Sequence, residues 1–258
     1  MFVLAATVAS AQTGRTTDPK AGVGEKYWVE FSATWWQPAL DGLVRSDSLG
    51  LIGSQIDLVS DLAFKNSSHR DIRLVLRPGK KHRFRFQYTP LGFTGDSLLS
   101  RDIAFAGQIY PVSLPVQSAL TWNVMRFGYE WDFFYRPRGF VGVLLEVRKT
   151  DMTAGIDSII GSGEIFANAP LPAIGLVGRA YPVRHVALNF EVSGLTLSDL
   201  IPDIEFKTLD YEFSATYNVT GNFGVSGGFR RMNTRLVFDT DMGELNFRGL
   251  WFGGVVRY

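Results

Sequence analysis

The stretch from Met125 to Phe134, which reads MRFGYEWDFF, alternates between two kinds of side chain. Its odd positions are apolar or aromatic, and its even positions up to Asp132 are charged or glycine. A period of two residues is typical of a β-strand with one apolar and one polar face, whereas a helix would show a period of about 3.6. The same alternation recurs in 186–193 and 209–218. We therefore expect an all-β chain.

The connections between these segments separate a membrane barrel from a soluble sandwich. Short connections lie at 78–81, 135–138, 182–184 and 220–221, and most of those between them are longer, at 39–69, 95–118, 155–168 and 198–205, before a final short one at 239–242. This alternation is typical of a barrel with short periplasmic turns at one end and longer outer loops at the other. Segments such as 222–238 also exceed the roughly 9–11 residues that a tilted strand needs to cross a bilayer. Both features favour a transmembrane barrel.

The carboxy-terminal residues 250–258, LWFGGVVRY, place four positions in phase with the terminal aromatic residue: Leu250, Phe252, Gly254 and Val256 with Tyr258. This end resembles the carboxy-terminal signal strand of bacterial outer-membrane β-barrel proteins. The resemblance implies a closed antiparallel up-and-down barrel in the outer membrane. It also implies membrane lipid as a partner, and recognition by the barrel assembly machinery through Leu250, Phe252, Val256 and Tyr258. No motif assigns the chain to one functional family.

Ten strands are expected, with twelve or eight as alternatives. Their ranges are 27–38, 70–77, 82–94, 119–134, 139–154, 169–181, 185–197, 206–219, 222–238 and 243–258. Twelve would result if 101–106 and 108–110 formed one more barrel hairpin rather than lengthening their neighbours. The segment 57–64 fits a short amphipathic helix or a strand extension, and we assign it to a loop.

The amino terminus, MFVLAATVASAQ, is a short apolar run closed by the A-x-A pattern of a signal-peptidase site at Ala9–Ala11. We expect cleavage after Ala11, a periplasmic lead at 12–25 and a barrel at 26–258. The longest stretch without a charged side chain, 103–125, contains two Pro and several polar residues, so no transmembrane helix is predicted.

Composition excludes several classes of function. The chain has 26 Lys and Arg against 25 Asp and Glu, a net charge of +1, which gives no basic field for nucleic acid. It has no Cys, so disulfides, Cys-based metal sites and thiol nucleophiles are excluded. No metal-binding or cofactor-binding motif occurs, and no cofactor is expected.

If the apolar phase of each strand contacts lipid, the opposite phase faces the lumen with eight acids and eight arginines. These are Glu30, Asp71, Glu130, Asp132, Glu146, Glu191, Asp210 and Glu212, and Arg73, Arg83, Arg85, Arg126, Arg148, Arg179, Arg230 and Arg257. Arg forms bidentate bonds with carboxylates, so these charges are expected to pair. Side chains already fill barrels of about eight strands, whereas water-filled channels belong to about 16–18. The pattern predicts a structural barrel or narrow channel with a largely filled lumen.

Two alternatives remain open. His69 lies at the loop end of its strand near Ser67, Ser68 and Asp71, and outer-membrane lipid A hydrolases and omptin proteases place His-based sites near that rim. The simpler interpretation is a polar loop end, and we expect no enzyme. His82 and His185 adjoin tight turns and have no catalytic pattern around them. The second alternative is a barrel subunit of an envelope complex.

Overall fold

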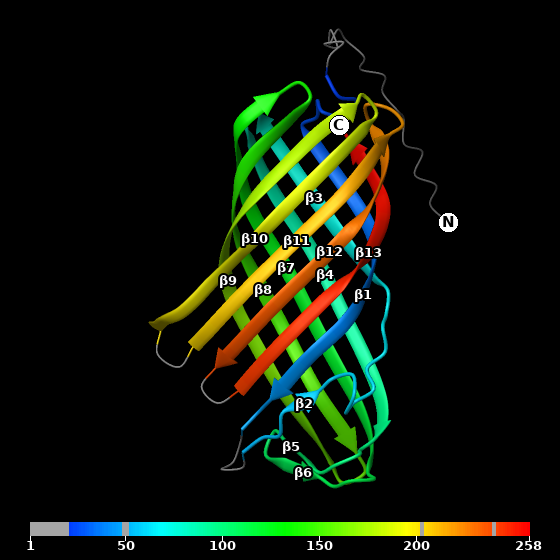
Figure 1. Ribbon diagram of the computed structural model, residues 1–258, viewed down its shortest axis with the longest axis vertical. Helices are drawn as coiled ribbons and strands as arrows, with labels where there is room; N and C mark the ends of the chain where they lie inside the picture. The colour runs from blue at the N-terminus through cyan, green and yellow to red at the C-terminus, as the bar shows by residue number, and fades with distance from the viewer. Residues whose placement is uncertain (1–20, 48–51, 202–203, 239–240) are drawn as a thin grey trace, which may run out of the picture.

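The computed structural model describes residues 21–47, 52–201, 204–238 and 241–258, and ten of its strands form one closed antiparallel barrel (Figure 1). They are β1 (Val29–Arg45), β3 (His69–Gly79), β4 (His82–Leu98), β7 (Pro115–Arg136), β8 (Gly139–Ser158), β9 (Gly161–Val183), β10 (Val186–Ile201), β11 (Ile204–Asn218), β12 (Phe223–Phe238) and β13 (Asp241–Arg257). The expected fold class and strand number are confirmed. The expected signal peptide lies outside the described residues.

The barrel closes where the last strand meets the first. β13 pairs with β1 in continuous antiparallel register from Glu30 opposite Arg257 to Arg45 opposite Met242. Closure joins the first and last strands of the sheet, and a closed wall of this kind is the condition for strands to cross a bilayer. The described ranges contain no helix long and apolar enough to span a membrane.

The two long loops, at the end that the sequence predicts to face the outside of the cell, carry three short strands of their own. β2 (Ile56–Asp57) pairs with β1, while β5 (Ile103–Phe105) and β6 (Gln108–Tyr110) pair only with each other. The hairpin expected as the source of a twelve-strand barrel therefore forms, but it stays outside the wall. The segment 57–64 is mostly turn, and Phe64 forms an isolated bridge with Gly95.

The expected loop at 155–168 is wrong. β8 and β9 continue through it and join in a turn between Ser158 and Gly161, so these strands have 20 and 23 residues. Backbone hydrogen bonds between two strands can continue beyond the bilayer, where no apolar outer face is needed. The alternation of apolar and polar residues therefore ends before the strand does. The outer end of the barrel therefore projects well beyond the roughly 9–11 residues that cross lipid.

The outward phase forms the apolar belt. Phe127, Trp131 and Phe213, which the sequence assigns to the lipid-facing side, are each about half exposed on the outer wall, at 53%, 46% and 51%. Aromatic rings pair across strands on this surface, as Phe190 does with Phe213 at 5.2 Å between ring centroids. An apolar exterior around a polar interior is the inverse of a soluble fold and is typical of a membrane barrel.

The inward phase changes character along each strand. In β7 the buried inward residues are apolar from Leu120 to Val124 and then charged at Arg126, Glu130 and Asp132. The lumen thus has an apolar outer half and a charged half toward the periplasm. The sequence interpretation predicted only the charged half.

Candidate functional site: the charged lumen and its outer plug

The structure places all sixteen predicted lumen charges inside the barrel, and each one lies within ion-pair distance of an opposite charge. Twelve of them are buried, and Arg73, Arg85, Arg179 and Glu212 are partly buried. Some ion pairs join neighbouring strands, as Arg83 does with Glu130, and others cross the lumen between strands that are not neighbours, as Arg126 does with Asp210.

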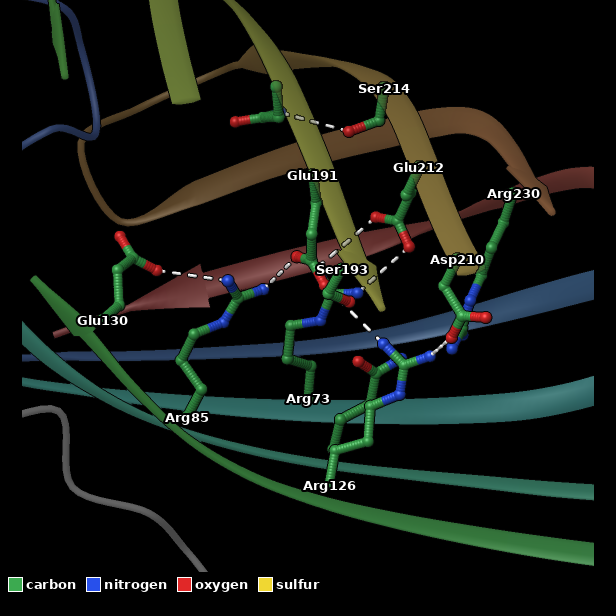
Figure 2. A network of polar contacts seen from close by, with 12 residues as sticks. Arg73, Arg85, Arg126, Glu130, Glu191, Ser193, Asp210, Glu212, Ser214 and Arg230 are labelled. Carbon is green, nitrogen blue, oxygen red and sulfur yellow. Dashed lines mark hydrogen bonds and ion pairs between the residues drawn. The ribbon is translucent and has the colours of Figure 1, made fainter. Parts of the chain in front are cut away.

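Glu191 of β10 is the centre of the network (Figure 2). Arg85 hydrogen-bonds its carboxylate, and Arg126 and Arg73 approach it at 3.7 and 4.0 Å. Arg73 also binds Glu212 at 3.1 Å. Three guanidinium groups around one carboxylate hold four strands in a fixed arrangement, because each planar fork accepts only a narrow range of geometries.

Arg126 pairs across the lumen rather than along its own strand. Its partners are Glu191 on β10 and Asp210 on β11, and not Glu130 or Asp132 of its own strand. Inward residues four apart on one strand are separated by about 13 Å, so a long side chain finds its partner on a facing strand. Asp210 also accepts a hydrogen bond from Arg148 at 2.9 Å.

The periplasmic end holds charges that the sequence interpretation missed. Glu25 is buried and lies 3.5 Å from Arg77 and 3.7 Å from Arg83, which also pairs with Glu130 and Asp132. Glu25 was assigned to a periplasmic lead because it precedes the first alternating residues. The one feature of the sequence that could have identified Glu25 as a lumen residue is its position shortly before the first barrel strand.

The amino-terminal segment reaches this position by crossing the mouth of the barrel. The backbone N–H of Gly22 donates to Pro137 at 3.0 Å, and that of Val23 donates to Arg184 at 2.7 Å. These acceptors lie in the neighbouring β7–β8 and β9–β10 turns, whereas the segment joins the wall at β1, which lies across the barrel from them, so the segment crosses the opening. Gly24 has φ of +80° with an arginine of β13 against it, a conformation that glycine adopts without strain.

A cavity of about 100 Å³ remains beside the network. Its wall includes the small hydroxyl side chains of β1, β11 and β12, namely Ser32, Thr34, Ser214, Thr216 and Ser226. This volume suffices for several water molecules, which can solvate the neighbouring charges. The charged half is therefore a filled but polar interior.

An apolar plug fills the outer half. Phe247 of β13 packs against Trp122 at 5.1 Å and against Phe93 at 5.6 Å between ring centroids. The loops insert further buried side chains into the same cluster, namely Ile56, Leu58, Leu62, Phe64, Leu99, Ile103, Phe105, Tyr110 and Leu114. We call this cluster the outer plug. The loops are thus folded against the lumen wall.

Polar contacts join the two loops above the plug. Arg101 pairs with Asp61 at 2.7 Å and donates to the carbonyl of Gln55 at 2.6 Å. Burial of Asp61 opposes its ionisation, but hydrogen bonds from Arg101 and from the backbone of Asp57 outweigh it and lower the pKa of Asp61. The ionised carboxylate therefore stabilises the folded loops.

His69 does not form a catalytic arrangement with its neighbours. Its Nε2 lies 2.7 Å from the Oγ of Ser67, whose hydroxyl donates to the carbonyl of Gly92 at 2.8 Å. Since the hydroxyl has one proton, the ring must donate to Ser67, which is the reverse of activating a nucleophile. The buried ring packs on Phe93, and no carboxylate in the described residues hydrogen-bonds it.

The other histidines have structural partners near the periplasmic turns. The Nδ1 of His82 contacts the hydroxyl of Tyr129 at 2.6 Å, and the Nδ1 of His185 contacts the carbonyl of Asn218 at 2.7 Å. Within the part of the chain that the structure describes, no group of three or more His, Asp or Glu side chains could hold a metal ion.

The predicted assembly-signal residues share the outer face of the closing strand. Leu250, Phe252 and Val256 point outward and are exposed, as is Tyr258. The backbone N–H of Tyr258 donates to Val29 at 2.9 Å, so the last residue is joined to the first barrel strand.

Comparison with known proteins gives a fold and no family. No family model matches the chain, and no curated protein does. Similar solved structures include the outer-membrane protease OmpT of Escherichia coli, with a TM-score of 0.55, 13% identity and coverage of 89% of this chain and 96% of that one. The translocator domain of autotransporter NalP from Neisseria meningitidis has a TM-score of 0.41 and 9% identity over 90% of this chain and 89% of that one. The toluene transporter TodX of Pseudomonas putida has a TM-score of 0.38 and 6% identity over 89% of each.

At these identities the likeness concerns the fold alone, and of these three structures OmpT has the TM-score that supports it. It agrees with the closed wall, the apolar belt and the polar interior. The chain therefore has the fold of bacterial outer-membrane β-barrels, and its apolar belt is the surface that contacts lipid.

Proposed function

We propose that this chain is a closed, non-conducting outer-membrane barrel whose folded loops form a rigid surface outside the cell. The outer plug carries the proposal. Trp122 and Phe247 are buried in the lumen with loop residues packed around them, so an ion would have to leave water to pass them. Below the plug, the paired charges narrow the lumen, and the amino-terminal segment, residues 22–27, covers part of its periplasmic mouth.

Conductance in planar bilayers tests this proposal. The wild-type barrel should show no steady single-channel current. A variant in which residues 53–64 are replaced by a Gly/Ser linker of the same length loses four plug side chains and should wet the outer lumen. Replacing Ile159 and Ile160 with Asn-Gly is the matched control, because this turn lies on the same outer side and supplies no plug residue.

A single introduced thiol reports the same property without current, because the chain has no Cys. Leu120→Cys should resist a water-soluble maleimide in the wild-type background and react when residues 53–64 are replaced. Steady wild-type current, or rapid labelling of Leu120→Cys with the loops intact, would contradict the closed barrel and favour a narrow channel.

The hydrolase alternative has less support. OmpT is a protease, but its 13% identity with this chain extends no activity to it. His69 donates to Ser67 and packs against Phe93, an arrangement that orders the loop end. A lipid or peptide hydrolysis that is lost in His69→Ala and retained in His82→Ala would favour the enzyme.

A role as a subunit of an envelope complex is favoured by exposed apolar residues at the outer end. Ile159, Phe166 and Leu98 are 91%, 73% and 65% exposed. Phe166 and Leu98 lie on strands that extend past the belt, and Ile159 lies in the turn between β8 and β9. Such side chains outside lipid mark sites of protein contact. Cross-linking from Phe166→Cys in intact cells would identify a partner. Recognition of the carboxy-terminal strand by the assembly machinery stays a prediction.

A further inference from the structure

Two arginines face each other on the outside of the barrel. Arg231 of β12 and Arg248 of β13 are direct cross-strand partners in the antiparallel register. Both side chains lie on the outer wall, where Arg248 is exposed and Arg231 is partly buried. Like charges directly opposite each other on one face of a sheet are destabilising unless an anion lies between them.

The described part of the chain does not supply that anion. The Nε of Arg231 donates to the amide oxygen of Asn246 at 3.1 Å, and neither arginine lies within 4.0 Å of a described carboxylate oxygen. Arg235, on the same strand and face, shows the contrast. It lies 3.6 Å from Glu205 and 3.5 Å from Glu244, so its charge is balanced within the protein.

The position of the pair along the strands points to the partner. Phe229 and Leu250 are the next outward-facing residues toward the periplasm and form a cross-strand pair in the apolar belt. Toward the outer end the next pair is Asn233 with Asn246. The two arginines therefore lie where the belt ends and the polar exterior begins, which is the depth of lipid head groups.

We propose that Arg231 and Arg248 bind a phosphate of a lipid in the outer leaflet, specifically of a phosphorylated glycolipid. A phosphate between two guanidinium forks accepts bidentate bonds from each and removes their repulsion. The acyl chains of the same lipid would lie on Phe229 and Leu250, so one molecule satisfies both the charged and the apolar surfaces. The leaflet follows from the long loops facing outward.

Equilibrium binding of a fluorescent bisphosphorylated lipid A to the purified full-length barrel in detergent micelles tests the proposal. Arg231→Gln/Arg248→Gln should weaken binding about a hundredfold, because each of the two lost charge-assisted contacts is worth about a factor of ten. Arg235→Gln is the matched control and should bind like wild type. An unchanged heat-dependent gel shift shows that each variant is folded.

Three further measurements separate the source of the phosphate. Lipid A without phosphate should bind the wild type no more tightly than it binds the double variant. Inorganic phosphate at millimolar concentration should not displace the bound lipid. Vesicles of phosphatidylglycerol should bind more weakly than lipid A. Equal binding by the double variant, by dephosphorylated lipid A or by phosphatidylglycerol would overturn the proposal, as would displacement by inorganic phosphate. Arg248→Gln alone tests the site if the double variant does not fold, because this exposed side chain has no protein partner in the described residues.

Discussion

At the scale of single residues, the lumen network depends on arginine rather than on charge alone. Glu191 has three arginines within ion-pair distance, and each of them also contacts a second carboxylate. A planar guanidinium offers five hydrogen-bond donors in a fixed arrangement and can bridge two carboxylates. The ammonium group of lysine has three rotatable donors, so it fixes the positions of two carboxylates less well. The sharing makes the network redundant, so removing one member leaves its acids with other cations.

Arg126→Ala tests this redundancy. Breaking a buried ion pair costs about 3–5 kcal/mol when the remaining charge has no partner. The cost should be smaller here, because Asp210 keeps Arg148 and Glu191 keeps Arg85. We expect a clearly lowered free energy of unfolding, measured by denaturant titration in lipid vesicles. Arg45→Ala is the control, since its pair with Asp47 is only partly buried, with 40% of the Arg45 side chain exposed, and should matter less. Equal shifts in the two variants would show that the network contributes no stability.

At the scale of elements, the outer loops differ from ordinary surface loops because they have a core. Leu58, Leu62 and Phe64 come from one loop and Phe105 and Tyr110 from the other, and all are buried in the outer plug. In neither loop do apolar and polar residues alternate over enough positions to predict a strand with an inward face. The sequence shows that these loops are rich in apolar residues. It does not show what they pack against, the inward face of the outer strand halves, because that surface is defined only by the register of the closed barrel.

The ion pair between Asp61 and Arg101 predicts that the loops loosen in acid. The folded pKa of Asp61 lies below its unfolded value of about 3.9, so its contribution is fully present above that value and is lost as the pH falls through the folded pKa. Hydrogen exchange of the segment around 52–64, corrected for intrinsic rates, should therefore accelerate below about pH 4. Asp61→Asn should be looser at neutral pH and lack this acid-dependent step. The same acceleration in both proteins would assign it to other carboxylates.

At the scale of the whole molecule, one repeating pattern determined most of what could be predicted. A period of two and a terminal aromatic strand were enough for ten strands and for the inward phase of residues such as Arg126 and Asp210, although one of the expected longer loops, 155–168, is almost entirely strand. The partners of these residues were not predictable, because they lie on facing strands whose separation depends on closure. Glu25 was missed for a related reason, since the mouth that it enters exists only after β13 meets β1.

The placement of the barrel in the bilayer gives the last prediction. Phe213 lies within the apolar belt beside Phe190 and Phe229, whereas Phe166 is an outward aromatic residue on the part of β9 beyond it. An arginine near the lipid midplane costs about 2–4 kcal/mol, and one at or beyond the interface costs about 0–1 kcal/mol. Phe213→Arg should therefore lower the yield of folded barrel in lipid vesicles, and Phe166→Arg should not. Because the same substitution is made on the same kind of outward side chain, the difference reports depth alone. Equal yields would mean that the belt is not where lipid contacts the wall.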